Sequence, residues 1–261
     1  MPSPALFQDR FRDQIALITG GAQGIGYAAA QRLAAEGASL WLLDHNMELA
    51  QQAAQSISES LSNTNQKIHA LQADISNEKQ VEESIRTVVS KSGKLDVMIN
   101  CAGIVGPNNK RITDTPASGF RNVFDINLLG SFLMTKYSLK AMEPKDYGRI
   151  LLVASIAGKE GNAGMVSYSS MKAGVIGLVK SVGKEFAETG ITINGLAPAV
   201  IRTALVDTME AAQVTYMTDK IPMKRCGTLA EAASIIGWIT SPEASFNTGF
   251  TFDLSGGRAV Y

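Results

Sequence analysis

A tyrosine and a lysine stand four residues apart in the run Tyr168-Ser169-Ser170-Met171-Lys172. In a helix this spacing places both side chains on one face, so the lysine cation lies near the phenol oxygen and favours its ionised form. A free tyrosine has a pKa of about 10, and lowering it to near neutrality requires about 4 kcal/mol. One cation at about 4 Å supplies a similar energy at an effective dielectric of about 20. The pair predicts acid–base chemistry, and the alternative is an ordinary contact on a helix surface.

Glycines crowd the turn that follows a predicted strand at 15–19. The turn contains Gly20, Gly21, Gln23, Gly24, Ile25 and Gly26, and an alanine-rich helical pattern follows at 27–36. Because glycine has no Cβ, the backbone can approach a pyrophosphate closely, and the first helical amides favour its negative charge. The turn therefore predicts a dinucleotide site. Its spacing departs from strict GxGxxG, and a turn that only packs helix on strand is the alternative.

Asp44 follows the next predicted strand, at 39–43, and lies roughly 20 residues beyond the last glycine. At this separation an acidic side chain meets the ribose hydroxyls of adenosine. A carboxylate accepts hydrogen bonds from two hydroxyls and repels a 2′-phosphate, and no arginine or lysine occupies Gln23 or the positions just after Asp44 to offset that repulsion. We therefore predict NAD rather than NADP. A simple turn at the strand end is the alternative for Asp44.

The elements that must position these residues alternate along the chain. Strand candidates lie at 15–19, 39–43, 68–72, 97–100, 150–154, 192–196 and 251–254, with helix-length segments between them. Near-continuous apolar strands separated by helices indicate a parallel sheet with helices on both faces, a doubly wound α/β architecture. No repeat or linker divides the chain, so we expect one domain over residues 1–261. Segment 205–226 is longer than a normal connection, and we predict a substrate lid there.

The composition excludes several classes of function. Lysine plus arginine number 24 and aspartate plus glutamate number 24, so no net positive charge attracts nucleic acid. Charges near the N-terminus and short apolar runs argue against a secretion signal and a membrane span, so we expect a cytoplasmic protein. Two cysteines and two histidines without ligand spacing predict no metal site.

Together with residues near the ends of other predicted strands, these motifs resemble the short-chain dehydrogenase/reductase family over nearly the whole chain. The resemblance is carried by Thr19–Gly26 (TGGAQGIG), Asp74, Asn100–Gly103 (NCAG), Asn127, Ser155, Tyr168–Lys172 (YSSMK) and Asn194–Thr203. It implies a single-domain Rossmann fold with a seven-stranded parallel sheet, and a catalytic tetrad of Asn127, Ser155, Tyr168 and Lys172. In these roles, Ser155 hydrogen-bonds the substrate oxygen and Tyr168 exchanges its proton. Lys172 holds the ribose and tunes Tyr168, and Asn127 supports a water relay. The alternative for Ser155 is a helix cap, for Asn127 a buried amide with its hydrogen bonds satisfied, and for Lys172 a solvated charge.

The resemblance also implies how a cofactor lies along the loops. Adenine is expected beside Asp74 and Ile75, and the loop 100–103 passes the adenosine and its ribose, with Cys101 a packed residue and not a nucleophile. Where the family usually has Pro-Gly, this chain has Pro198-Ala199, and we expect the Val200 backbone and the Thr203 hydroxyl to reach the nicotinamide carboxamide. The predicted cofactor-binding residues are Gly20, Gln23, Gly24, Ile25, Gly26, Asp44, Asp74, Ile75, Asn100, Ala102, Gly103, Tyr168, Lys172, Pro198, Val200 and Thr203.

The predicted substrate wall mixes apolar, charged and amide groups. It comprises Ile156, Ala157, Lys159, Glu160, Asn162, Val200, Arg202 and segment 205–226. Candidate substrate contacts are Ala157, Asn162 and Arg202, and either Arg202 or Lys159 is expected to hold a carboxylate unless it is a solvated surface charge. The Pro-Ala-Val-Ile turn, Asp44 and the closing Ser255-Gly256-Gly257-Arg258 resemble members that oxidise sugars, polyols or 2-keto-3-deoxy sugar acids. The resemblance thus implies an NAD-dependent oxidoreductase that moves a hydride between nicotinamide and a secondary alcohol or ketone.

Two alternative functions stay open. One is a 3-oxoacyl-thioester (acyl carrier protein) reductase, whose close relatives usually prefer NADP and carry a basic residue where this chain has Gln23. The other is a catalytically silent nucleotide-sensing protein, against which the complete tetrad argues. The resemblance further implies a homotetramer in which the helices bearing Asn127 and Tyr168 pack against copies of themselves. The final residues, 258–261, either reach a neighbouring subunit or form a frayed tail.

Overall fold

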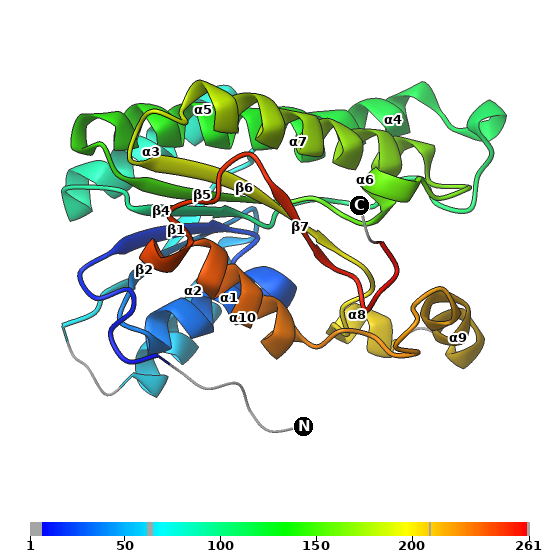
Figure 1. Cartoon of the computed structure of the whole chain (residues 1–261), viewed down its shortest axis with the longest axis horizontal. Coiled ribbons are helices and arrows are strands. Elements are labelled where there is room, and N and C mark those ends of the chain that lie inside the picture. The colour runs from blue at the N-terminus through cyan, green and yellow to red at the C-terminus, as the bar shows by residue number, and fades with distance from the viewer. Residues whose placement is uncertain (1–6, 62–64, 209, 260–261) are drawn as a thin grey trace.

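A seven-stranded sheet forms the centre of the molecule (Figure 1). The computed structural model describes residues 7–61, 65–208 and 210–259. The strands are β1 (Ile15–Thr19), β2 (Ser39–Asp44), β3 (Ile68–Gln72), β4 (Val97–Asn100), β5 (Gly148–Val153), β6 (Ile191–Pro198) and β7 (Thr251–Leu254). All pairs are parallel, in the order β3-β2-β1-β4-β5-β6-β7. The prediction of a single-domain Rossmann fold with a seven-stranded parallel sheet is confirmed.

The strand bounds differ from the prediction mainly at β5 and β6. β5 begins at Gly148 and ends at Val153, and β6 continues to Pro198. Proline has no amide hydrogen and so cannot donate to a neighbouring strand. Its carbonyl still accepts a hydrogen bond, from Ile156 N at 3.0 Å. This bond ties the end of β6 to the loop that follows β5.

Helices cover both faces of the sheet (Figure 1). One layer consists of α1 (Gly24–Ala35), α2 (Met47–Ser60) and α10 (Leu229–Ile239), and the other of α3 (Glu78–Ser92), α4 (Ala117–Val123), α5 (Gly130–Met142) and α7 (Val166–Glu185). Neighbouring residues of β1 enter different cores: Leu17 packs with α3, α5 and α7, whereas Ala16 and Ile18 pack with α1, α2 and α10. Because both faces are buried, the strands are apolar almost throughout.

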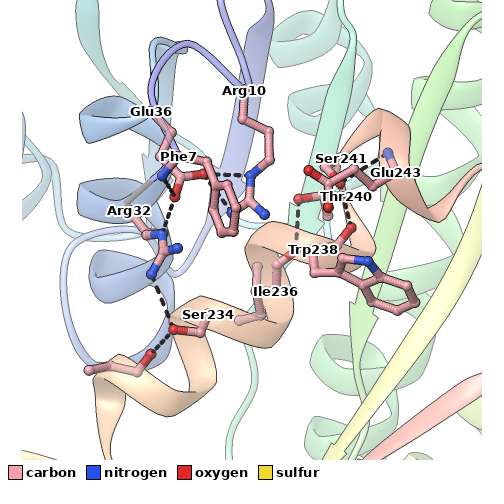
Figure 2. Close-up of polar contacts among 11 residues, drawn as sticks. Phe7, Arg10, Arg32, Glu36, Ser234, Ile236, Trp238, Thr240, Ser241 and Glu243 are labelled. Atoms are coloured by element: carbon pink, nitrogen blue, oxygen red, sulfur yellow. Dashed lines mark hydrogen bonds and ion pairs between the residues drawn. The ribbon is translucent and has the colours of Figure 1, made fainter. Parts of the chain in front are cut away.

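A buried ion cluster joins the N-terminal segment and α1 (Figure 2). The Glu36 carboxylate is fully buried and accepts hydrogen bonds from Arg10 Nε, at 2.6 Å, and from Arg32 Nε. Phe7 N donates to the same carboxylate at 3.2 Å, and Arg32 Nη1 reaches Ser234 Oγ of α10 at 3.2 Å. The two arginines compensate one buried charge and fix α1 against α10.

Shorter elements border the carboxyl ends of the strands. η2 (Phe124–Leu129) is a π-helical stretch between α4 and α5, and α6 (Ala157–Glu160) follows β5. The segment predicted as a lid contains α9 (Ala211–Asp219) and all but the first residue of α8 (Ala204–Asp207), and both helices stand beside the main body (Figure 1). The 3₁₀ turns are η1 (Ile112–Asp114), η3 (Glu143–Lys145) and η4 (Pro242–Ala244). Of the helices in the described part of the chain, none has the length and apolar character that crossing a membrane requires.

Candidate active site

Ser155 and Tyr168 meet at the carboxyl edge of the sheet. Ser155 lies two residues beyond the end of β5, and Tyr168 is in the first turn of α7. The Ser155 hydroxyl lies near enough to the phenol to act on the pKa of Tyr168, and Ser155 Oγ accepts a hydrogen bond from Ala157 N at 3.1 Å. Ser155 is 8% exposed, so its side chain is held in place by these contacts. Two hydroxyl groups that converge in this way can both hydrogen-bond one substrate oxygen.

Lys172 lies one turn further along α7 and is 5% exposed. Its Nζ donates a hydrogen bond to Val153 O at 2.6 Å and lies 5.7 Å from the centre of the Tyr168 ring. Burial removes water from the ammonium group and lowers the pKa of Lys172 from 10.5 to about 8, with a smaller opposing effect of Cys101. The four-residue spacing therefore brings the lysine and the tyrosine to the same site.

The predicted lowering of the tyrosine pKa by the lysine is not found within the polypeptide. Burial raises the pKa of Tyr168 above its usual 10, and the hydrogen bond with Ser155 opposes that shift without reversing it. The reason is geometric, because Lys172 Nζ is directed to the Val153 carbonyl instead of the phenol oxygen. Ionisation of Tyr168 near neutrality therefore requires a further positive charge close to the phenol.

Asn127 is hydrogen-bonded to the backbone of the loop after β4. It lies in the π-helical stretch η2 and is fully buried. Its Oδ1 accepts a hydrogen bond from Ile104 N at 2.8 Å, and its Nδ2 donates to Ile104 O at 2.9 Å. A Cβ added to Gly103 would lie 3.2 Å from Asn127 Oδ1 and 3.6 Å from Lys172 Nζ, so both side chains close on this glycine. Asn127 thus positions the loop, and the water relay stays a prediction.

A cleft connects the glycine turn with the tyrosine. A cavity of about 410 Å³ opens where β1 adjoins β4, the point at which the strand order changes direction. Its lining includes the predicted residues Gly20, Gln23, Ile25, Gly26, Asp44, Asp74, Ile75, Ala102, Gly103 and Thr203. A second cavity, of about 220 Å³, has Ser155, Tyr168, Lys172 and Pro198 in its wall. The two cavities share Ile25, Cys101, Gly103, Ile104 and Thr203, and so form one cleft.

The glycine turn fits a pyrophosphate. Gly20 has φ +59°, and a Cβ on Gly26 would lie 2.2 Å from Gly20 O, so neither position accepts a side chain without a shift. α1 begins at Gly24, and the side chain of its N-cap residue, Gln23, makes no hydrogen bond to the first-turn amides. These amides and the positive end of the helix dipole are therefore left for an anion at the cavity wall.

Asp44 forms the far end of this cavity. Its side chain is 7% exposed; Oδ2 accepts a hydrogen bond from Ala22 N at 3.4 Å, and Oδ1 accepts one from Asn46 N at 3.2 Å. Among the described residues that line the cavity, none is a lysine or an arginine. The carboxylate is thus fixed where it can accept hydrogen bonds from hydroxyl groups, and no resident lysine or arginine neutralises it.

Three predicted cofactor residues lie outside the walls of these two cavities: Gly24, Asn100 and Val200. Asn100 is 2% exposed, accepts a hydrogen bond from Thr19 Oγ1 and donates one to Ser131 Oγ at 2.9 Å, so it joins β4 to β1 and α5. Val200 lines a separate cavity of about 380 Å³, and its carbonyl accepts a bond from Gly227 N at 2.9 Å. Direct contact of these three residues with a cofactor stays a prediction.

Comparisons with known proteins agree with this arrangement. Residues 20–259 match the family model described as enoyl-(acyl carrier protein) reductase. The chain belongs to the short-chain dehydrogenase/reductase family. The resemblance carried by the glycine turn and the Tyr168–Lys172 motif is therefore confirmed.

Individual members of the family match over nearly their full length. The chain is 38% identical to a 2-dehydro-3-deoxy-L-rhamnonate dehydrogenase (NAD(+)) of a Sphingomonas species, over 98% of this chain and 100% of that protein. It is 36% identical to a 3-oxoacyl-(acyl-carrier-protein) reductase of a Synechocystis species, over 95% and 98% of the two chains. Among solved structures, levodione reductase matches with a TM-score of 0.90 at 32% identity, covering 96% of this chain and 100% of that one. NAD+-bound xylitol dehydrogenase matches with a TM-score of 0.88 at 28% identity, covering 95% and 99%.

In this short-chain dehydrogenase/reductase, the predicted substrate wall is held by ion pairs. Arg202 is 70% exposed and pairs with Asp207 at 2.7 Å, and Lys159 pairs with Asp253 at 2.8 Å. Ala157 is 2% exposed, and its amide is bonded to Ser155 Oγ. Both cations predicted to hold a carboxylate are therefore engaged with acidic side chains of the chain itself.

Arg258 of the C-terminal segment folds back onto the same chain. Its Nε and Nη2 donate to Glu160 Oε2 at 2.9 Å and 2.7 Å, and Nη2 also donates to Asn162 Oδ1 at 3.2 Å. The Arg258 side chain is 9% exposed. The C-terminal segment therefore positions Asn162, a candidate substrate residue. Arg258 and Glu160 are 98 positions apart, so no local pattern in the sequence indicates their contact.

Other parts of the site also carry little signal in the sequence. The anchors of Lys172 and Asn127 are the backbone groups of Val153 and Ile104, and any residue type provides such groups.

Cys101 lines both cavities, and burial raises the pKa of its thiol to about 12, which agrees with the predicted packed, unreactive residue. The described residues contain no group of three or more histidine, cysteine, aspartate or glutamate side chains that could hold a metal ion.

Proposed function

We propose that this protein is an NAD-dependent oxidoreductase that interconverts a secondary alcohol and a ketone of a small polar substrate. The observation that carries the proposal is the single cleft that runs from Asp44 past the glycine turn to Ser155 and Tyr168. The names of the Sphingomonas dehydrogenase and of the NAD+-bound xylitol dehydrogenase support NAD as the cofactor. The buried Asp44 carboxylate supports the same choice, because it favours two ribose hydroxyls over a 2′-phosphate.

The side chains divide the proton chemistry between them. Bound NAD supplies the hydride acceptor and, in its oxidised form, the positive ring that the buried phenol requires. Tyr168 takes the proton of the substrate hydroxyl and returns it in the opposite direction, while Ser155 hydrogen-bonds the same oxygen. With a pKa of about 8, Lys172 is mostly charged at neutral pH. It acts as a fixed cation that holds ribose hydroxyls and faces the Tyr168 ring.

We propose a sugar, a polyol or a 2-keto-3-deoxy sugar acid as the substrate. The names of the rhamnonate and xylitol dehydrogenases support this class. The polar character of the predicted substrate wall also supports it: Asn162 accepts a hydrogen bond from Arg258, and Lys159 forms an ion pair with Asp253. A 3-oxoacyl-thioester reductase is the second candidate, and the 36% identity to the Synechocystis enzyme favours it.

A substrate panel separates these functions. Purified protein is incubated with NAD and, in parallel, with NADP, and each mixture receives a sugar, a polyol, a sugar acid or a 3-hydroxyacyl thioester. We expect NADH to form with a polyhydroxylated substrate and little NADPH with any. Turnover of thioesters alone would establish the second candidate. NAD binding without turnover of any member would instead support the nucleotide-sensing protein.

We also propose that residues 205–226 close over the bound substrate. The contacts at the ends of this segment support a hinge, because Arg202 N donates to Gly227 O at 2.8 Å and Met223 N donates to Gly256 O at 3.2 Å. Between these anchors, Tyr216 is 63% exposed. Slower proteolysis of the segment in the presence of NAD and substrate is the expected result, and unchanged cleavage would contradict closure.

We propose a homotetramer in the cytoplasm. Two apolar grooves, of about 450 Å³ and about 410 Å³, lie along α4, η2, α5 and α7. Phe120 is 39% exposed and Phe132 is 45% exposed at these grooves. Gly174 and Gly177 of α7 line the second groove, and small residues allow another helix to approach closely. A reducing cytoplasm is compatible with the two free thiols, Cys101 and Cys226.

A further inference from the structure

The loop that joins α6 to α7 carries Asn162 close to the acid–base group. Asn162 N donates a hydrogen bond to Ser169 Oγ at 3.1 Å, and Ser169 directly follows Tyr168 in α7. Asn162 O accepts a hydrogen bond from Met165 N at 3.1 Å, which closes the loop into a turn. The backbone of Asn162 is therefore fixed beside the first turn of α7, and the orientation of its side-chain amide is set by other contacts.

The guanidinium of Arg258 sets that orientation. Arg258 Nη2 donates a hydrogen bond to Asn162 Oδ1 at 3.2 Å. Because a guanidinium has donors and no acceptor, the amide oxygen must face Arg258, and the Nδ2 group is turned the other way. Nδ2 contacts Met165 Sδ at 3.8 Å, and a thioether is a weak acceptor. The Nδ2 hydrogens are therefore open to a stronger oxygen acceptor.

Arg258 is itself held by the fold on two sides. Its Nε and Nη2 donate to Glu160 Oε2 at 2.9 Å and 2.7 Å, and its side chain is 9% exposed. After β7 the chain turns back toward α6 (Figure 1), and Arg258 N donates to Ser255 O at 3.2 Å in this turn. Gly256 and Gly257 provide its left-handed backbone, with φ values of +60° and +88°. The C-terminal turn thus presents the guanidinium to the loop at a fixed place.

We propose that Arg258 is a positioning residue that fixes the Asn162 amide as a hydrogen-bond donor to an oxygen of the substrate. The inference rests on the proposed function and deepens it. Without Arg258, the amide can turn over about its terminal bond, because that torsion is broad and roughly two-fold, and it then presents an oxygen in place of the donor.

The neighbouring charges favour the same role for the amide. Arg202 and Lys159 are paired with acidic side chains of the chain, whereas the Asn162 donor meets a thioether. Among the proposed substrates, a sugar acid gains most from this donor, because hydrogen bonds to an ionised acceptor are roughly twice as strong as neutral ones.

Steady-state kinetics of the whole protein, with NAD and a substrate found in the panel, test the donor. Asn162→Asp keeps an oxygen for Arg258 and replaces the donor by a second oxygen, so we expect KM for the substrate to rise at least about tenfold. Arg258→Met removes every donor to the amide, and we expect KM to rise about tenfold. In both variants kcat and the Kd of NAD are expected to change little, because the substrate keeps this contact in the ground state and the transition state alike.

A double variant separates positioning from a loss of stability. Asn162→Ala has no donor, so adding Arg258→Met to it is expected to leave KM where Asn162→Ala alone puts it. Lys94→Gln is the matched control, because Lys94 pairs with Asp96 at 3.0 Å just before β4, at the opposite end of the sheet. This control is expected to keep the KM of the wild type. All rates are measured well below the melting temperature of the least stable variant.

The possible results separate the role of Arg258 from the proposed function. An unchanged KM in Asn162→Asp, or an equal effect of Arg258→Met in the wild type and in Asn162→Ala, would overturn the positioning role while the oxidoreductase function stands. A wild type that turns over no member of the panel would overturn the proposed function and this inference together.

Discussion

The substitution Lys172→Met tests the buried ammonium, because methionine has a similar length and no charge. Burial lowers the pKa of Lys172 from 10.5 to about 8, so the unfolded chain binds this proton more tightly than the folded chain. Where the unfolded state binds more protons, the free energy of unfolding rises with pH. The wild type is therefore expected to gain stability relative to Lys172→Met as the pH rises from about 8 towards 10.5.

The expected gain follows from the size of the pKa shift. A decrease from 10.5 to about 8 corresponds to about 3 kcal/mol, at about 1.4 kcal/mol per unit. Lys172 is 5% exposed, so solvent screening reduces this energy little. About 2 kcal/mol of it falls between roughly pH 7 and pH 9.5. The variant also loses the hydrogen bond to Val153 O, a cost of about 1–2 kcal/mol.

Urea unfolding at roughly pH 7 and pH 9.5, followed by the fluorescence of Trp41 and Trp238, measures the free energy of unfolding of each variant. Lys180→Met is the matched control, because Lys180 is an exposed lysine of the same helix. We expect the difference in the free energy of unfolding between the wild type and Lys172→Met to change by about 2 kcal/mol between these pH values. The difference between the wild type and Lys180→Met is expected to stay constant. If the difference in unfolding free energy between the wild type and Lys172→Met does not depend on pH, burial does not lower the pKa of Lys172.

Three further substitutions test other parts of the site. Gly26→Ala places a Cβ 2.2 Å from Gly20 O, so we expect at least about a tenfold loss of NAD affinity in calorimetry; unchanged affinity would contradict the fit of the turn. Gly177→Gln adds a side chain where nothing lies within 4 Å, so the subunit is expected to fold normally. Light scattering is expected to show loss of the tetramer, and a retained tetramer would contradict an interface at the groove that Gly177 lines. Arg258→Gln removes bonds to Glu160 and Asn162, and we expect a loss of about 1–2 kcal/mol, seen as a melting temperature about 4 °C lower. An unchanged melting temperature would show that the C-terminal contact does not stabilise the fold.

Local patterns in the sequence predict the sheet and much of the site. Strand periodicity, the glycine turn, Asp44 and the four-residue spacing of Tyr168 and Lys172 are all properties of short segments. The direction of the tyrosine pKa shift is not such a property, because it depends on burial and on the capture of Lys172 by a backbone carbonyl. The contact of Arg258 with Glu160 joins segments 98 positions apart, and only the folded chain shows it.

The most direct measurement of the central claim compares the rate of NAD reduction by Tyr168→Phe with that of the wild type, on a substrate found in the panel. The control is Tyr27→Phe, because the Tyr27 hydroxyl donates to the exposed Ser56 Oγ, at 3.1 Å. Because Tyr168 moves the substrate proton, we predict a loss in kcat of about a thousandfold for Tyr168→Phe, with little change in NAD affinity. The control is expected to keep the wild-type rate. Turnover by Tyr168→Phe at the wild-type rate would contradict the assignment of Tyr168 as the acid–base group.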